Sequence, residues 1–384
     1  MRVPPETRPS APLTRRDALR RLAGTVIANS ALAGCSGVAR SRDGTPTRVR
    51  RLAKVLVSPE RIIRQVAGLR PFRPSGFVLR ADSLGDKPII HNYGHGGGGV
   101  SLSWGTAQLA VDLALSTPHR DAAVLGCGVV GLSTARLLQD HGFTVTIYAK
   151  DLPPNTTSNV SGASWAPFSV ADRDARSQAF NDQFVKASRI AYRYFQTLVS
   201  PRYGVWWRES YILSDQPAAG RSWENALIGD MLPAVVPLEA GTHPFGALRA
   251  SRALTMHIEP SVYLPAALAD YRLAAGRIVV TELRDVQSVR ALPHPLVVNC
   301  TGLGAAALFG DKELVPVKGQ LVVLAPQPEV DYLTLGPSRF YMMPRRDGIV
   351  LGGTQERGVW SLEPNPIETD RIIRGHQSLY ERVG

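Results

Sequence analysis

The sequence is poor in cysteine and in long hydrophobic runs. Only three cysteines occur in 384 residues, Cys35, Cys127 and Cys300, which are too few and too scattered for a disulfide framework or a zinc site. After residue 51, no apolar run approaches the roughly 20 residues that a membrane-spanning helix needs. Charged residues make up 20% and hydrophobic residues 44% of the chain, as is typical of a globular protein with a sizeable core.

Positive charge is concentrated at the start of the chain. The formal net charge is +12, and residues 1–51 carry +8 of it, with eleven arginines against three acids. The remainder of the sequence is close to balanced. We therefore predict a basic leader and no basic binding face, and we expect no nucleic-acid partner.

Residues 1–34 have the features of a bacterial export signal. Residues 14–20, with Arg15 and Arg16, resemble the twin-arginine translocation motif, and a weakly apolar stretch follows it. Residues 32–35 resemble a lipobox, in which cleavage leaves Cys35 to carry a diacyl anchor. With residues 35–51 as a flexible tether, we expect a lipoprotein held at a membrane surface facing the periplasm or the cell exterior. The alternative is a disordered basic tail.

A nucleotide-binding fingerprint follows a short apolar strand at residues 122–125. Residues 126–131 read GCGVVG, a helical pattern continues through Leu138, and residues 144–148 form the next predicted strand. In such a unit the first glycine allows the tight turn, the second lets the backbone approach a pyrophosphate, and the third lets helix and strand pack. Asp151, one residue later than usual, is the candidate ligand of the ribose hydroxyls.

Residues 155–165 form a small, hydroxyl-rich loop, which is typical either of a cofactor-wrapping loop or of plain turns. We predict helices near residues 179–198 and 262–275, and strands at 207–213, 277–281 and 296–299. The middle of the chain therefore reads as a substrate domain threaded between nucleotide-binding segments.

Several of these segments together resemble the D-amino-acid oxidase family, whose FAD-binding fold is of the glutathione-reductase-like Rossmann type. The most specific are residues 68–74, GLRPFRP, and residues 91–99, HNYGHGGGG. The others are the fingerprint, the hydroxyl-rich loop and residues 297–302, 341–344 and 351–354. Family members carry the GLRPFRP-like and HNYGHG-like segments after the fingerprint, whereas here both precede it. The resemblance therefore implies a circularly permuted order.

The resemblance implies an α/β fold with a Rossmann-type FAD-binding domain and an interleaved α+β substrate domain. FAD-binding segments fall at about residues 52–71, 88–172 and 277–325, and the substrate domain at about 173–276 and 326–365. We expect a helix from about residue 101 to 115 to start at the cofactor and lead to the first strand. The new chain ends then fall at a surface junction, where permutation is tolerated.

The resemblance also implies the roles of individual residues. Arg70 and Tyr341 bind the substrate carboxylate, and the carbonyl of Gly97 receives the amine. Arg73, His91 and His95 are expected to be structural. The expected cofactor-binding residues are Gly96, Gly97, Gly99, Val100, Ser101, Gly126, Gly128, Val129, Val130, Gly131, Asp151, Thr156, Thr157, Ser158, Gly162, Ala163, Ser164, Val280 and Thr301. No metal site is expected.

The implied activity is FAD-dependent oxidative deamination of D-amino acids by dioxygen, giving a 2-oxo acid, ammonia and hydrogen peroxide. Gly98 and Pro337 stand where family members often carry aromatic residues, so we expect a more open pocket. One alternative is an oxidase of the same family acting on D-aspartate, glycine or a secondary amine, with Arg339, Arg345 or Arg346 as a further cation. Another is a non-catalytic flavin-binding lipoprotein. The oligomeric state stays open, a homodimer included.

Overall fold

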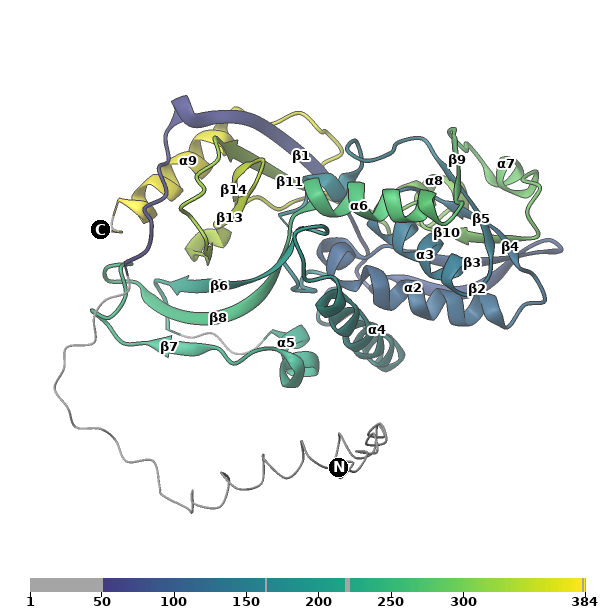
Figure 1. The fold of residues 1–384 in the computed structure, drawn as a ribbon, viewed down its shortest axis with the longest axis horizontal. Coiled ribbons are helices and arrows are strands. Elements are labelled where there is room, and N and C mark those ends of the chain that lie inside the picture. Colours follow the sequence, from purple (N-terminus) through teal and green to yellow (C-terminus); the bar gives the residue numbers. More distant parts are fainter. Residues whose placement is uncertain (1–50, 163, 218–221, 382, 384) are drawn as a thin grey trace, which may run out of the picture. The chain divides into compact units, whose positions relative to one another are not determined.

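The computed structural model describes residues 51–162, 164–217, 222–381 and 383. The predicted signal, Cys35 and all of the tether except Arg51 lie outside these residues, as does Ala163. The described residues build two sheets, one of six strands and one of nine, which lie side by side (Figure 1).

The six-stranded sheet has the order β2-β3-β10-β4-β5-β9, and all of its strands are parallel except β2. Its strands are β2 (Val78–Leu84), β3 (Lys87–Tyr93), β4 (Asp121–Leu125), β5 (Thr144–Ala149), β9 (Arg277–Val280) and β10 (Leu296–Asn299). Helices cover both faces of this sheet, so both faces of β4 are buried. Ala122 and Val124 pack on one face, and Ala123 and Leu125 pack on the other.

Helices α2 (Gly99–Leu115) and α3 (Val129–Asp140) pack on one face of this sheet, while α7 (Val286–Arg290) and α8 (Gly304–Phe309) pack on the other. The strand–glycine turn–helix–strand unit predicted from the fingerprint is confirmed as β4, α3 and β5. The helix expected at residues 101–115 is confirmed as α2, which begins two residues earlier.

Strand β3 precedes the fingerprint in the chain and yet lies inside the parallel sheet, beside β10. From its end the chain passes through the glycine run into α2, and only five residues separate Leu115 from Asp121 at the start of β4. The chain therefore enters the parallel part of the sheet at β3, after the antiparallel edge strand β2, and α2 then leads to β4 through one short connection, as compact folds favour.

The nine-stranded sheet has the order β1-β11-β14-β13-β12-β6-β8-β7, with β15 also paired to β11. Its strands are β1 (Ile62–Phe72), β6 (Val205–Ser214), β7 (Val236–Leu238), β8 (Arg249–Ile258), β11 (Val315–Leu324), β12 (Leu333–Leu335), β13 (Tyr341–Arg345), β14 (Gly348–Gly352) and β15 (Glu356–Arg357). Helices α4 (Gln178–Thr197), α5 (Trp223–Ile228), α6 (Pro260–Leu273) and α9 (Pro366–Tyr380) complete the described fold.

Strands β1 and β11 lie in the nine-stranded sheet, although the predicted flavin-binding segments include them. They form a long antiparallel pair from Ile62 opposite Leu324 to Phe72 opposite Val315. By their contacts the described residues form a single unit, Val49–Gly384, so the division into two domains stays a prediction.

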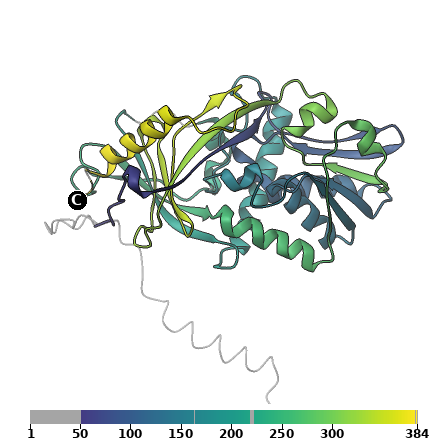
Figure 2. The ribbon, with the colours of Figure 1, turned by 90° about the horizontal axis from the view of Figure 1, so that it is seen from above.

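The two ends of the described fold lie together. Val55 and Val383 share one hydrophobic cluster, and the Gln377 side chain donates a hydrogen bond of 3.2 Å to the carbonyl of Val57. In Figure 2 the end of α9 lies beside the segment that leads into β1. A short link could therefore join these ends without disturbing the sheets.

Candidate active site

A cavity of about 1410 Å³ lies at the carboxyl ends of the parallel strands. Strands β3, β4, β5 and β10 all end at it, because parallel strands place their carboxyl ends along one edge of a sheet. The predicted site residues that line it are Arg70, Gly96, Gly97, Gly99, Val100, Ser101, Gly126, Gly128, Val129, Val130, Asp151, Thr156, Thr157, Ser158, Gly162, Ser164, Thr301 and Tyr341.

Two predicted residues are not part of the cavity wall. Gly131 lies behind it, where a Cβ would be 2.1 Å from the carbonyl oxygen of Gly126. Its role is thus the close packing of α3 on the turn. Val280 lies on the outer edge of the sheet, with 64% of its surface exposed, and residues 281–284 line the cavity in its place.

The fingerprint turn directs the N-terminus of α3 at the cavity. Gly126 has φ +100°, and its amide donates to the carbonyl of Tyr148 at 2.8 Å. The hydroxyl of Ser158 accepts a hydrogen bond of 3.0 Å from the amide of Val129 and ties the hydroxyl-rich loop to the helix start. Amide donors and the positive end of the helix dipole suit an anionic pyrophosphate, so this end of the cavity fits FAD.

The glycine run places a second helix N-terminus at the same cavity. Gly96, Gly97 and Gly99 line the wall, and α2 begins at Gly99 with no acidic residue in its first turn. The amide of Gly97 donates to the carbonyl of Ser169 at 3.0 Å, which holds the run against residues 166–172. Because glycines have no side chain, a flat ring can lie directly against this backbone, as the isoalloxazine of FAD would require.

The expected opening of the pocket at Gly98 is wrong. A Cβ at Gly98 would lie 2.7 Å from Cγ2 of Val170 and 3.2 Å from Cδ1 of Leu102. These side chains fill the space that an aromatic residue would need, so the absence of an aromatic residue leaves no extra room.

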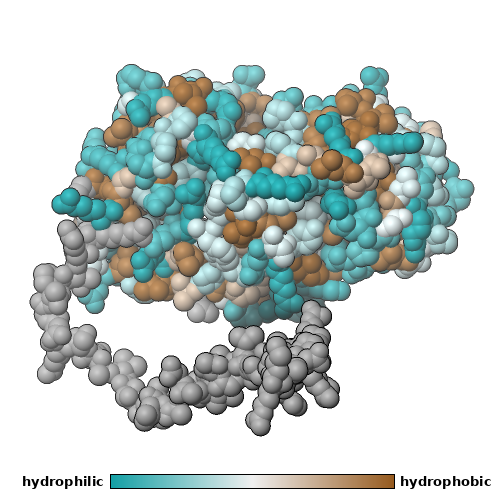
Figure 3. Space-filling model, viewed as in Figure 1, coloured by the Kyte–Doolittle hydropathy of each residue, from teal (hydrophilic) through white to brown (hydrophobic). Residues whose placement is uncertain are grey.

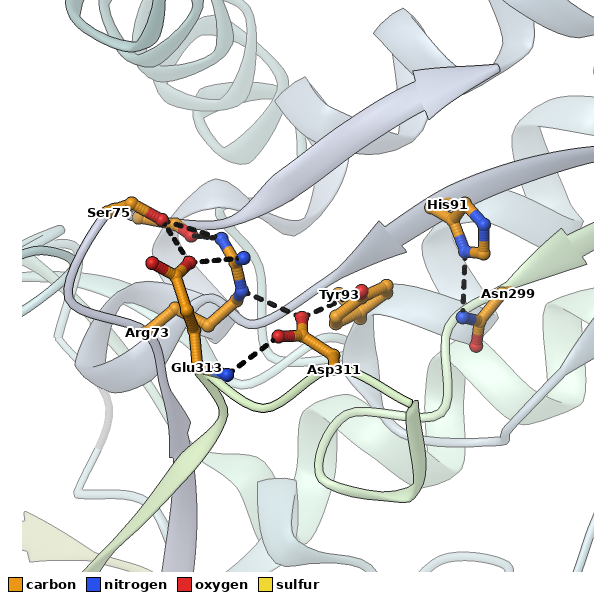
Figure 4. Close-up of polar contacts among 8 residues, drawn as sticks. Arg73, Ser75, His91, Tyr93, Asn299, Asp311 and Glu313 are labelled. Atoms are coloured by element: carbon orange, nitrogen blue, oxygen red, sulfur yellow. Dashed lines mark hydrogen bonds and ion pairs between the residues drawn. The ribbon is translucent and has the colours of Figure 1, made fainter. Parts of the chain in front are cut away.

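A charged network fixes the ends of β1 and β3 relative to the segment before β11 (Figure 4). Arg73 binds Asp311 at 2.8 Å and also pairs with Glu313, and the Tyr93 hydroxyl donates to Asp311 at 2.8 Å. Burial raises the pKa of Asp311, but hydrogen bonds from Tyr93 and the Glu313 amide, together with Arg73, lower it overall. Arg73 is therefore engaged in holding the segment that leads into the glycine run.

His91 and His95 are both buried and hydrogen-bonded. The side chains of His91 and Asn299 approach to 3.0 Å (Figure 4). The side-chain Oδ1 of Asn299 accepts a hydrogen bond of 2.7 Å from the Thr301 hydroxyl. His95 stacks on Phe77 and lies 3.1 Å from the Thr106 hydroxyl, and burial lowers its pKa to about 3. His95 is therefore neutral at physiological pH and is poorly placed to act as an acid.

Arg70 and Tyr341 converge on the cavity from opposite ends of the chain. Both side chains line the cavity, and the charge of Arg70 acts on the Tyr341 hydroxyl. Burial raises the pKa of Tyr341 by more than the charges of Arg70 and Arg345 lower it, so its hydroxyl keeps its proton. A guanidinium and a hydroxyl together are suited to bind a carboxylate.

Sequence reasoning missed the apolar wall beside this pair. Val160, Leu321 and Met343 line the cavity and belong to the same cluster as Tyr341. Their alternation along β11 and β13 could have indicated one buried face, but not which face meets the cavity.

Two cysteines line the cavity, and both are buried. Burial raises the pKa values of Cys127 and Cys300 to about 12, which makes both thiols inert. Among the described residues, no group of three or more histidine, cysteine, aspartate or glutamate side chains could hold a metal ion.

Residues 15–113 and 121–383 match a family model described as FAD dependent oxidoreductase. D-amino-acid oxidase from Rubrobacter xylanophilus is 31% identical over 270 residues, 68% of this chain and 78% of that protein. The Streptomyces coelicolor D-amino-acid oxidase is 33% identical over 268 residues, with the same two shares. Human D-aspartate oxidase is 28% identical over 274 residues, 65% and 73% of the two chains.

Solved structures of similar fold include glycine oxidase from Geobacillus kaustophilus, with a TM-score of 0.50 at 19% identity over 69% of this chain and 79% of that one. L-α-glycerophosphate oxidase from Mycoplasma pneumoniae, solved with FAD bound, has a TM-score of 0.50 at 15% identity over 70% and 80%. These likenesses concern the fold. With the family model matched over most of the sequence, the chain belongs to this family of FAD-dependent oxidoreductases, and its cofactor is FAD.

Proposed function

We propose that the protein oxidises D-amino acids, and that it prefers those with apolar side chains. The observation that carries the proposal is the convergence of Arg70 and Tyr341 on the wall of one cavity. The relatives above 30% identity are D-amino-acid oxidases, which supports the same substrate class. The products are a 2-oxo acid, ammonia and hydrogen peroxide.

In this proposal the protein acts by positioning its substrate. Arg70 pairs with one carboxylate oxygen or both, and Tyr341 donates its phenolic proton to the same group. The carbonyl of Gly97 accepts an N–H of the neutral amine, so two ends of the substrate are fixed and its α-hydrogen has one orientation. FAD, when bound, would supply the hydride acceptor for that hydrogen, and dioxygen would be the final electron acceptor.

The surroundings of the clamp favour an apolar side chain over an acidic one. Arg345 forms two hydrogen bonds of 2.9 Å to Asp347, and only 2% of its side chain is exposed. Arg346 lies over the ring of Trp206, and Arg339 lines a separate cavity. The cations required for D-aspartate are thus either neutralised or directed elsewhere, whereas Val160, Leu321 and Met343 offer an apolar surface.

A comparison of peroxide release from several substrates tests the proposal. We expect kcat/KM for D-alanine, D-methionine or D-valine to exceed that for D-aspartate by about tenfold or more, because a buried carboxylate would lack a partner. Glycine and sarcosine distinguish the related oxidases, and the L-enantiomers serve as controls. Equal or faster oxidation of D-aspartate would contradict the proposed preference. If no D-amino acid gave peroxide, the proposed activity itself would be wrong.

We also propose that the chain is a circular permutation of the family order. The family model matches it in two blocks that meet near residues 113–121. The D-amino-acid oxidases align over only 68% of this chain and 78% of their own length, as expected if one terminal block has moved. The short connection from α2 to β4 and the adjacent ends of the described fold support the same interpretation.

We propose further that the protein is exported as a lipoprotein and anchored through Cys35. The basic leader, the twin-arginine-like motif and the lipobox-like residues 32–35 support this. Among the residues that the structure describes, no helix is long and apolar enough to cross a membrane. The face in Figure 3 is largely hydrophilic, with hydrophobic residues in separate groups. Replacing Arg15 and Arg16 by lysine should move the protein from the membrane fraction to the cytoplasm. An unchanged distribution would rule out twin-arginine export.

A further inference from the structure

Two strands separate Arg70 from Tyr341. Arg70 belongs to β1 and Tyr341 to β13, while β11 and β14 lie between them in the sheet. Side chains on a sheet ordinarily stand roughly perpendicular to it. For these two to meet, each must instead lie across a neighbouring strand.

A glycine occupies each crossing point. A Cβ at Gly319, on β11, would lie 2.4 Å from Nη2 and 2.7 Å from Cζ of Arg70. A Cβ at Gly352, on β14 directly opposite Tyr341, would lie 2.0 Å from Cζ and 2.4 Å from the hydroxyl oxygen of Tyr341. All four distances are far inside van der Waals contact, so any larger residue at either glycine would displace the side chain above it.

The backbone itself does not require glycine at these positions. Neither Gly319 nor Gly352 has a positive φ, and both continue regular antiparallel ladders. Glycine weakens a strand interior, so its presence in two adjacent strands needs another reason. Space for Arg70 and Tyr341 is that reason.

We propose that Gly319 and Gly352 are positioning residues that hold the carboxylate clamp in its binding geometry before substrate arrives. The identity of the ligand rests on the proposed function, but the geometry does not. With Arg70 and Tyr341 each lying closely over a glycine of a neighbouring strand, little side-chain freedom is left to lose on binding. The apolar residues around Tyr341 further limit its movement.

Gly319→Ala and Gly352→Ala test this proposal, with Gly336→Ala as the matched control. Gly336 lies in the same sheet region, between β12 and β13, and a Cβ there meets nothing closer than 3.5 Å. Binding of benzoate to the FAD-loaded protein, followed by the visible flavin spectrum, gives a readout independent of turnover. We expect the Kd of benzoate to rise about 10- to 100-fold in each test variant, because each variant should lose about one charge-assisted hydrogen bond to the carboxylate. The control should match the unsubstituted protein.

A thermal-unfolding cycle separates positioning from a general fault in folding. Gly352→Ala should lower Tm in the unsubstituted protein but have little effect in Tyr341→Ala, where its Cβ meets no ring. Equal losses of Tm in both backgrounds, or an unchanged Kd for benzoate, would overturn the proposal. The cycle needs no substrate, so coupling between the two positions would stand even if no D-amino acid were oxidised.

Discussion

Replacing Arg70 with alanine is expected to lower kcat/KM for D-amino acids about a thousandfold, roughly 4 kcal/mol of transition-state stabilisation. The guanidinium supplies the charge that fixes the carboxylate, and it lines the same cavity as the Tyr341 hydroxyl. Without it, the substrate loses its main anchor. Steady-state kinetics with D-alanine or D-methionine measures the effect.

Two further variants separate geometry from charge at this position. Arg70→Lys keeps the charge but loses the planar fork, so its kcat/KM should fall about 10- to 100-fold. Arg64→Ala, on the same strand but at an exposed ion pair with Asp347, should stay near the unsubstituted protein. All three should retain FAD, since Arg70 is distant from the fingerprint turn in sequence and lies in the other sheet. Full activity of Arg70→Ala would exclude it as the carboxylate ligand.

Moving the chain ends should preserve flavin binding if the chain is opened between α2 and β4, and should abolish flavin binding if the chain is opened between Gly98 and Gly99. A protein that begins at Asp121, joins Val383 to Leu52 through a short glycine–serine link and ends at Ser116 opens only the loop between α2 and β4. Because Val55 and Val383 already share a cluster, we expect this protein to fold and to bind FAD. A protein opened instead between Gly98 and Gly99 separates the glycine run from α2, and should bind no FAD.

Flavin absorbance after purification measures both rearranged proteins, and circular dichroism shows whether each is folded. Loss of FAD from the protein opened at residues 116–121 would contradict the permuted order. Retention of FAD by the protein opened at Gly98 would show that α2 does not contribute to the cofactor site.

Local chemistry made much of the parallel sheet predictable. The fingerprint glycines combine a tight turn with close helix packing, and both needs arise within a few residues of Gly126 and Gly131. The convergence of distant segments was also predictable, since β3, β4 and β10 end at one edge whatever their order in the chain. Helix α2, which begins at Gly99, could be predicted from the periodicity of its own sequence and the glycine run before it.

Features that depend on pairing across the sheet were not predictable. Gly319 is needed because of Arg70, 249 positions earlier in the chain, and no local pattern connects the two. For the same reason, the sequence suggested open space at Gly98, although the Val170 side chain, from a separate loop, fills that space. Arg345 is a different case, because its partner Asp347 lies only two positions later, in the turn between β13 and β14, and the ion pair could have been predicted from the sequence.

The central claim is that the cavity binds a D-amino acid and directs its α-hydrogen to the flavin. Anaerobic mixing of the purified yellow protein with D-methionine tests it directly, because reduction of the flavin removes its visible absorbance without any need for oxygen. We predict rapid bleaching with D-methionine, none with L-methionine, and much slower bleaching in Arg70→Ala. A protein that keeps its yellow colour with every D-amino acid would contradict the claim, and its flavin would then have a role other than amino-acid oxidation.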